Sequence, residues 1–253
     1  MGSPFSLDGQ VALVTGASRG LGAGIARALA AAGAHVVLHA SRTPATTTAE
    51  AIHAAGGPET RCLEADLSDR TASDALVANA IAWRGRLDTL VNNAGIIRRA
   101  AAEAYDDEAW DEVVEVNLSS VFRLARTAGA HMLERGSGRI INVASLLSFQ
   151  GGIRVAAYAA AKGGVAQLTK ALANEWAGRG VNVNAIAPGY MVTDNTQALR
   201  EDAGRSAQIL ARIPAGRWGQ PDDLGGAAVF LASAAASYVH GHVLVVDGGW
   251  MGR

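Results

Sequence analysis

The stretch QVALVTGASRGLG, residues 10–22, decides the fold of this chain. Its first half is a continuous apolar run of the length of one buried strand. Its second half places three glycines, Gly16, Gly20 and Gly22, where a helix is expected to begin. Glycines allow a sharp turn and let backbone N–H groups approach a pyrophosphate at a helix N-terminus. The stretch therefore predicts a strand, a nucleotide-binding turn with Ser18, Arg19 and Leu21 among its contacts, and a helix.

Short apolar runs and longer helical patterns alternate along the rest of the chain. Strands are predicted at residues 10–15, 35–39, 61–65, 87–92, 138–144, 181–186 and 242–246. Helices are predicted up to about residues 32 and 55, and over 68–83, 106–134 with a break near Val116, 155–178 and 222–232, and residues 188–217 are expected to be irregular or to carry short helices. Buried strands that are separated by helices form parallel sheets covered on both faces. We expect one domain over residues 1–253, an α/β doubly wound Rossmann-type fold with a single seven-stranded parallel sheet.

Composition excludes several classes of protein. The chain has 253 residues, of which 49% are hydrophobic and 18% charged, and its formal net charge is −1, which argues against a nucleic-acid or anionic-membrane surface. The single cysteine, Cys62, rules out an internal disulfide framework, and the six histidines lack metal-ligand spacing. No run reaches ~18 uninterrupted apolar residues, and the N-terminus lacks a secretory layout, although its first six residues satisfy the loose N-myristoylation pattern. We expect a cytoplasmic protein with no metal, no membrane and no nucleic acid.

Two further motifs follow predicted strands. Asp66 and Leu67 end the third strand, where an adenine ring could be held, and Asn93, Ala94 and Gly95 end the fourth. Side-chain amides bond neighbouring backbone groups, and a glycine lets a cofactor pass closely. Since the carboxyl ends of parallel strands share one edge of the sheet, these residues are expected to complete a dinucleotide site.

The end of the second strand bears on the choice of cofactor. An acidic residue there binds the ribose 2′-hydroxyl of NAD, whereas an arginine accepts the 2′-phosphate of NADP. The sequence from His39 to Arg42 holds no carboxylate. This favours NADP, with Ser41, Arg42 and Arg19 near the phosphate.

The second half of the chain carries the candidate catalytic residues. Ser145 ends the fifth strand, and Tyr158 and Lys162 are four residues apart on the following helix, so that they share one face. A tyrosine that acts as an acid/base near neutrality must lose about three units from its free pKa of ~10, or roughly 4 kcal/mol, and a nearby lysine ammonium helps. Ser145 could hold the substrate oxygen. Asn117, at the predicted helix break, could hold a water in a proton path to Lys162.

Together these motifs resemble those of the short-chain dehydrogenase/reductase family over nearly the whole chain. The resemblance implies a Rossmann-type fold, NAD(P)-dependent interconversion of an alcohol and a carbonyl, and a homotetramer. It implies that the tyrosine is the acid/base, that the serine orients the substrate, and that the lysine also binds the nicotinamide ribose. Pro188, Gly189 and Thr193 would flank the nicotinamide.

A narrower resemblance lies in the segments expected near the substrate. NNAGIIRR at 92–99, SLLSFQGGIRV at 145–155, APGYMVTDNTQALR at 187–200 and RIPAGRWG at 212–219 are similar to the 2-deoxy-D-gluconate 3-dehydrogenases, also called 2-dehydro-3-deoxy-D-gluconate 5-dehydrogenases. Those enzymes act on sugar acids, commonly with NAD. The preference between NAD and NADP therefore stays open at this point.

A sugar acid needs an arginine for its carboxylate and polar partners for its hydroxyls. Arg98 or Arg154 is our prediction for the carboxylate, with Gln150, Tyr190 and Asn195 among the other contacts. Two alternatives are a reductase of another carbonyl, such as a 3-oxoacyl thioester, and a protein that only binds nucleotide. The full set of Asn117, Ser145, Tyr158 and Lys162 argues against the latter.

Overall fold

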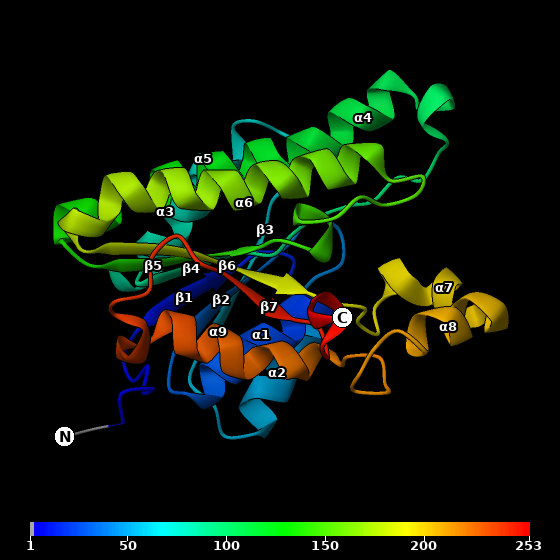
Figure 1. Cartoon of the computed structure of the whole chain (residues 1–253). Helices are drawn as coiled ribbons and strands as arrows, with labels where there is room; N and C mark the ends of the chain where they lie inside the picture. Colours follow the sequence, from blue (N-terminus) through cyan, green and yellow to red (C-terminus); the bar gives the residue numbers. More distant parts are fainter. Residues whose placement is uncertain (1–2) are drawn as a thin grey trace.

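The structure is a computed structural model that describes residues 3–253; Met1 and Gly2, which begin the short myristoylation match, lie outside the described residues. Its centre is one parallel sheet with the strand order β3-β2-β1-β4-β5-β6-β7 (Figure 1). The strands are β1 Val11–Val14, β2 His35–Ala40, β3 Thr60–Glu64, β4 Thr89–Asn92, β5 Gly138–Val143, β6 Val181–Pro188 and β7 Val243–Val246. The predicted fold class is confirmed.

Helices cover both faces of this sheet (Figure 1). One layer holds α1 Gly20–Ala31, α2 Thr46–Ala54 and α9 Gly225–Ala232, the last preceded by the short turn η6 Pro221–Leu224. The other layer holds α3 Ala72–Arg84, α4 Asp107–Val114, α5 Ser120–Arg135 and α6 Ala156–Trp176. Strands β1, β4, β5 and β6 are almost wholly buried, as apolar runs between two helical layers must be.

The predicted break in the helix at residues 106–134 is a π-helical turn, Glu115–Ser119, between α4 and α5. A single π turn inside a long helix often marks a functional site, because it shifts the register of the side chains. Here it brings Asn117 to the inner face, where the residue is fully buried.

Between β6 and α9 the chain leaves the sheet and forms the substrate arm, residues 194–213 (Figure 1). The arm contains the turn η5 Asp194–Thr196 and the short helices α7 Gln197–Glu201 and α8 Ala203–Leu210, as expected for this segment. The C-terminal turn η8, Trp250–Gly252, lies beside it.

The order of the strands places a switch point between β1 and β4. β2 and β3 extend the sheet on one side of β1, whereas β4 to β7 extend it on the other. Ligands of doubly wound sheets bind at the carboxyl ends of the strands at such a point.

Among the described residues, none of the helices is both long and apolar enough to cross a membrane. The same residues contain no cluster of three or more His, Cys, Asp or Glu side chains with the arrangement of a metal site.

Candidate active site

A groove of about 570 Å³ runs along the carboxyl edge of the sheet. Nearly all the residues predicted to bind the cofactor line it: Gly16, Ser18, Arg19, Gly20, Leu21, Ser41, Arg42, Asp66, Leu67, Asn93, Ala94, Gly95, Tyr158, Lys162, Pro188, Gly189 and Thr193. Gly22 is the exception, because it packs inside the turn. A Cβ at Gly22 would come within 2.2 Å of the Gly16 carbonyl oxygen and 2.5 Å of Asn93 Nδ2.

The glycine-rich turn leaves the start of α1 open toward the groove. Gly16 and Gly20 adopt positive φ angles of 64° and 55°, which glycine tolerates without strain. Arg19 is the N-cap of α1 and makes no side-chain cap hydrogen bond, and the first turn of the helix holds no acidic residue. The unpartnered N–H groups of a helix start form a ready site for a phosphate. These residues therefore fit a dinucleotide pyrophosphate.

Two residues, to which the sequence analysis gave no structural role, hold this turn in place. Thr15 Oγ1 accepts the N–H groups of Asn93 and Ala94, both at 3.0 Å, which fastens β4 to β1. His39 is buried, and its Nδ1 accepts the Gly16 N–H at 3.3 Å while Nε2 lies 3.0 Å from the Ala65 carbonyl oxygen. Burial lowers the pKa of His39, which keeps the ring neutral and Nδ1 free to accept.

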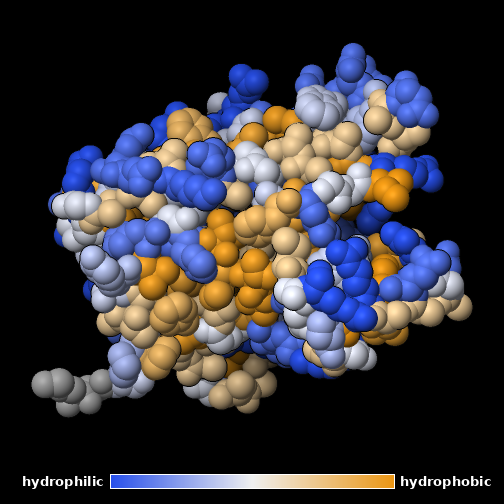
Figure 2. Space-filling view, viewed as in Figure 1, coloured by the Kyte–Doolittle hydropathy of each residue, from blue (hydrophilic) through white to orange (hydrophobic). Residues whose placement is uncertain are grey.

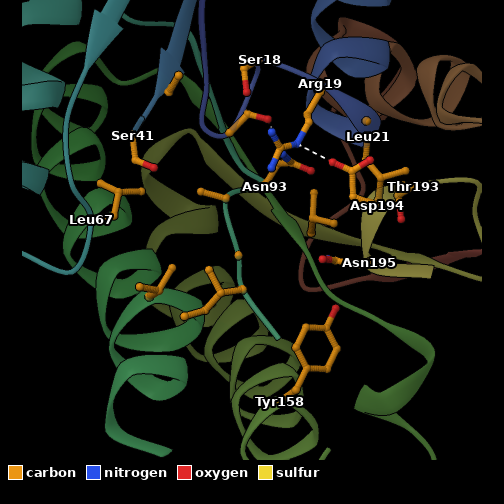
Figure 3. Close-up of a pocket in the computed structure, with 18 of the residues that line it drawn as sticks. Ser18, Arg19, Leu21, Ser41, Leu67, Asn93, Tyr158, Thr193, Asp194 and Asn195 are labelled. Atoms are coloured by element: carbon orange, nitrogen blue, oxygen red, sulfur yellow. Dashed lines mark hydrogen bonds and ion pairs between the residues drawn. The ribbon is translucent and has the colours of Figure 1, made fainter. Parts of the chain in front are cut away.

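Charged side chains lie on both sides of the groove. Ser41 and Arg42 follow β2 and line the groove. Strand β2 itself contains no aspartate or glutamate. Arg19 pairs with Asp194 of the substrate arm at 2.8 Å, and the pair lies on the opposite side of the groove from Tyr158 (Figure 3).

Tyr158 and Lys162 lie on one face of α6, with Lys162 Nζ 5.7 Å from the centre of the Tyr158 ring. Lys162 is 3% exposed, and its Nζ donates to the Val143 carbonyl oxygen at 2.6 Å. Burial lowers the pKa of Lys162 to about 8. Burial also raises the pKa of Tyr158, and a hydrogen bond from Ser145 and the charge of Arg99 act in the opposite direction.

Ser145 is held close to this pair through Ser148. The Ser148 hydroxyl donates to the Lys162 carbonyl oxygen at 2.7 Å and accepts the Ser145 N–H at 3.3 Å. The start of the turn after β5 is therefore tied to the middle of α6. A serine hydroxyl and a tyrosine hydroxyl that point to the same space can hold one oxygen of a substrate between them.

The Asn117 side chain makes contacts that the sequence analysis did not predict. Its Oδ1 accepts the Ile96 N–H and its Nδ2 donates to the Ile96 carbonyl oxygen, both at 2.8 Å. Each polar atom of the side chain therefore already has one partner within the protein, and one N–H donor and one lone pair remain. These two bonds join the π turn to the segment after β4.

A second cavity, of about 490 Å³, opens next to Ser145 and Tyr158 between α6, the segment after β4 and the substrate arm. Figure 2 shows the molecule hollowed between the substrate arm and the α4 end of the upper helical layer. We call this space the substrate cavity. Three arginines, Arg99, Arg205 and Arg212, line it, and its described lining holds no aspartate or glutamate. It is therefore electropositive next to the reactive tyrosine.

A family model described as enoyl-(acyl carrier protein) reductase matches residues 16–251, which is nearly the whole chain. The chain belongs to the short-chain dehydrogenase/reductase family.

Several members of the family are similar to the chain over almost its full length. The 2-dehydro-3-deoxy-D-gluconate 5-dehydrogenase of Pseudoalteromonas atlantica is 58% identical over 98% of both chains. The 3-oxoacyl-(acyl-carrier-protein) reductase of Salmonella typhimurium is 42% identical over 97% of this chain and 98% of its own.

Solved structures agree with this assignment. A candidate 2-deoxy-D-gluconate 3-dehydrogenase from Agrobacterium tumefaciens, with bound NADP, superposes with a TM-score of 0.94 at 55% identity over all of both chains. A gluconate 5-dehydrogenase from Burkholderia cenocepacia, in complex with NADP and tartrate, has a TM-score of 0.93 at 42% identity over 99% of this chain and 98% of its own. The chain thus has an NAD(P)-binding dehydrogenase fold.

In this short-chain dehydrogenase/reductase, two of the predicted substrate contacts, Arg98 and Arg154, do not line the substrate cavity. Arg98 lines the cofactor groove and pairs with Glu112 at 2.9 Å, so its charge is already balanced. Arg154 is exposed and lines neither cavity, and its backbone has a φ of 63°. Its carbonyl oxygen accepts the Ala100 N–H at 3.1 Å, so this residue serves the turn before α6. Gln150, Tyr190 and Asn195 do line the substrate cavity.

The arginines that line the substrate cavity of this protein are not the two that we predicted. Arg99 lies beside Arg98 in the sequence but faces the other cavity, and its Nη2 donates to the Asn195 carbonyl oxygen at 2.9 Å. Arg205 and Arg212 belong to the substrate arm. The sequence of the arm has no periodic apolar pattern from which the direction of its side chains could be predicted. The segments APGYMVTDNTQALR and RIPAGRWG pointed to that region without showing which of its arginines face the cavity.

Proposed function

We propose that this chain is an NAD(P)-dependent dehydrogenase that interconverts a secondary alcohol and a ketone on a sugar acid of the 2-dehydro-3-deoxy-D-gluconate or 2-deoxy-D-gluconate type. One observation carries the substrate class: the cavity next to Tyr158 holds three arginines and no carboxylate among its described lining. Arginine is well suited to binding a carboxylate by two parallel hydrogen bonds. The names of the similar proteins from P. atlantica and A. tumefaciens support the same class.

Tyr158 is the acid/base in this proposal. In the direction of oxidation its phenolate accepts the proton of the substrate hydroxyl, and in the direction of reduction its hydroxyl returns it. Ser145 holds the substrate oxygen, and Lys162 holds the nicotinamide ribose and adds positive charge near the phenolate. Asn117 holds the segment after β4 through Ile96, which keeps the wall of the site fixed.

The nicotinamide cofactor, when bound, accepts or donates the hydride. The turn at Gly16 and Gly20 and the start of α1 would hold its pyrophosphate, while Pro188, Gly189 and Thr193 would flank the nicotinamide. We propose that NADP is preferred, with Arg42 at the 2′-phosphate. The basic residue and the missing carboxylate at the end of β2 support this.

The assembly and the number of domains are part of the proposal. One core sheet runs through the chain, which supports a single domain. Trp110 on α4 and Phe122 on α5 are exposed large apolar side chains, which supports an assembly that would bury them, and we propose a homotetramer. We also propose that the protein is cytoplasmic, because a chain with a single cysteine is typical of a reducing compartment.

A second candidate function is the reduction of a 3-oxoacyl thioester, as the name of the S. typhimurium relative says of that protein. Apolar side chains such as Leu147, Ile153 and Leu199 also line the substrate cavity, but a fatty acyl chain carries no anion that its three arginines could bind. The arginines of the substrate cavity therefore favour the sugar acid.

The test is absorbance at 340 nm with 2-dehydro-3-deoxy-D-gluconate and with 2-deoxy-D-gluconate, each supplied with NAD and with NADP. Turnover of either acid, at a higher kcat/KM with NADP, is expected. A chain that binds dinucleotide, ignores both acids and reduces a 3-oxoacyl thioester would overturn the proposed substrate. Equal or better turnover with NAD would overturn the role of Arg42 alone.

A further inference from the structure

Arg212 differs from the other cations of the substrate cavity because an aromatic platform holds it. Its guanidinium carbon lies over the Trp250 ring, 4.0 Å from the centre. Stacking on a ring fixes the plane of a guanidinium but leaves the N–H donors at its edge available. Such a group is ready to bind a planar carboxylate through two hydrogen bonds.

The platform itself is rigid. Trp250 is only 5% exposed, its Nε1 donates to Gln150 Oε1 at 3.3 Å, and the Tyr190 ring lies 4.6 Å away. Trp250 also packs in a small apolar cluster with Ile209 and Ile213 of the substrate arm. The C-terminal turn and the arm are thus packed together around the base of Arg212, and Arg253 Nη1 donates to the Ala211 carbonyl oxygen at 2.9 Å.

The other two arginines are placed differently. Arg99 contacts Asn195, which lines both the cofactor groove and the substrate cavity, so Arg99 stands where the two spaces meet. Arg205 is exposed, as are Arg99 and Arg212, but its Nη1 donates to Gln208 Oε1 at 3.2 Å on the same helix and no aromatic ring holds it among the described contacts. Arg212 lines the substrate cavity and not the cofactor groove.

We propose that Arg212, stacked on Trp250, binds the carboxylate of the sugar acid and that the reacting carbon lies toward the junction with the cofactor groove, away from that carboxylate. This inference rests on the proposed function and adds the residue that recognises the acid. Arg99, at the junction of the two spaces, faces the reacting end of the same substrate.

The experiment compares an acid with its uncharged amide in wild type and variants. The wild type should use 2-deoxy-D-gluconate at least 30-fold better than 2-deoxy-D-gluconamide, in kcat/KM. In Arg212→Gln this preference should fall below threefold, through KM rather than kcat. Arg212→Lys should keep an intermediate preference, since it retains the charge but loses the planar fork.

Two further variants make the result specific. Arg179→Gln removes the same charge from an exposed position outside both cavities and should leave the preference unchanged. Trp250→Leu, which removes the platform and keeps Arg212, should lower the preference by several fold. The dissociation constant for NADP, from quenching of tryptophan fluorescence or from calorimetry, checks that each variant is folded.

The outcomes separate the two proposals. If Arg212→Gln keeps the full preference for the acid, or if Arg99→Gln abolishes it while Arg212→Gln does not, the role of Arg212 is overturned and the proposed function stands. If the wild type uses neither the acid nor the amide but turns over a 3-oxoacyl thioester, the proposed function is overturned, and the role of Arg212 with it.

Discussion

Tyr158 is the residue on which the proposed chemistry depends, and its surroundings disfavour the ionised form. Replacing it by phenylalanine removes the proton acceptor and leaves the volume almost unchanged. We expect Tyr158→Phe to lower kcat by roughly 100- to 10,000-fold, the usual range for a general acid/base. The affinity for NADP, measured by calorimetry, should change little. A variant that keeps a tenth of the turnover would exclude this role.

Arg99 gives a second prediction at the same scale. Burial raises the pKa of Tyr158, whereas Ser145 and the positive charge of Arg99 lower it. Because oxidation needs the phenolate, kcat should rise with pH through the apparent pKa of Tyr158. Removing the cation in Arg99→Met should move the midpoint of that rise to higher pH. A pH profile of kcat at saturating substrate measures it, with Arg179→Met as the control, and an unmoved midpoint would contradict the contribution of Arg99.

At the scale of elements, the turn between β1 and α1 forms part of the cofactor site. Gly22, in the first turn of α1, is the position in this region where the structure tolerates a side chain least. A Cβ there would lie 2.2 Å from the Gly16 carbonyl oxygen, so Gly22→Ala must displace the turn. We expect at least a tenfold loss in affinity for NADP and a lower melting temperature. Gly226→Ala in α9 is the matched control, since a Cβ there meets nothing within 4 Å. That variant should gain about 0.5–1 kcal/mol of stability.

How far the sequence predicts the structure also differs between elements. Buried strands and long helices were found because their apolar patterns are set by the two layers that cover the sheet. The π turn was anticipated only as a break, since its extra residue leaves no pattern that names it. The directions of the Arg98, Arg99 and Arg154 side chains could not be predicted. They lie in irregular segments, where no periodicity shows which cavity a side chain faces, and the adjacent residues Arg98 and Arg99 face different cavities. His39 was read as part of a cofactor motif, and its role as a brace for Gly16 depends on the proximity of three strands that sequence spacing does not show.

At the scale of the whole molecule, the two ends of the strands have different roles, one in function and the other in stability. The carboxyl edge holds the site, and the amino edge holds Asp88, which accepts the Val11 N–H and pairs with Arg86 and Arg135. Burial alone would raise the pKa of Asp88, but the hydrogen bonds from Arg86, Val11 and Arg135 outweigh it and hold the pKa below its usual value.

This arrangement predicts how stability depends on pH. A carboxyl whose pKa is lower in the folded state stabilises the protein above its unfolded pKa, and the contribution is lost as pH falls through the folded pKa. Asp88→Asn should therefore lower the free energy of unfolding at pH 7 and flatten its fall below pH 4. The orphaned hydrogen bonds should cost about 1–3 kcal/mol. Urea denaturation at pH 7 and at pH 3 measures both, and an equal loss at the two pH values would contradict the assignment.

The substrate arm lies outside the strands and helices that hold Ser145, Tyr158 and Lys162, and it supplies two of the three arginines of the substrate cavity. Recognition of the acid and chemistry on the alcohol are therefore built from different lengths of chain. Such a division makes the enzyme modular. Exchanging residues 194–213 between members of the family, together with the Trp250 that supports them, should transfer the substrate preference without any change to the catalytic residues.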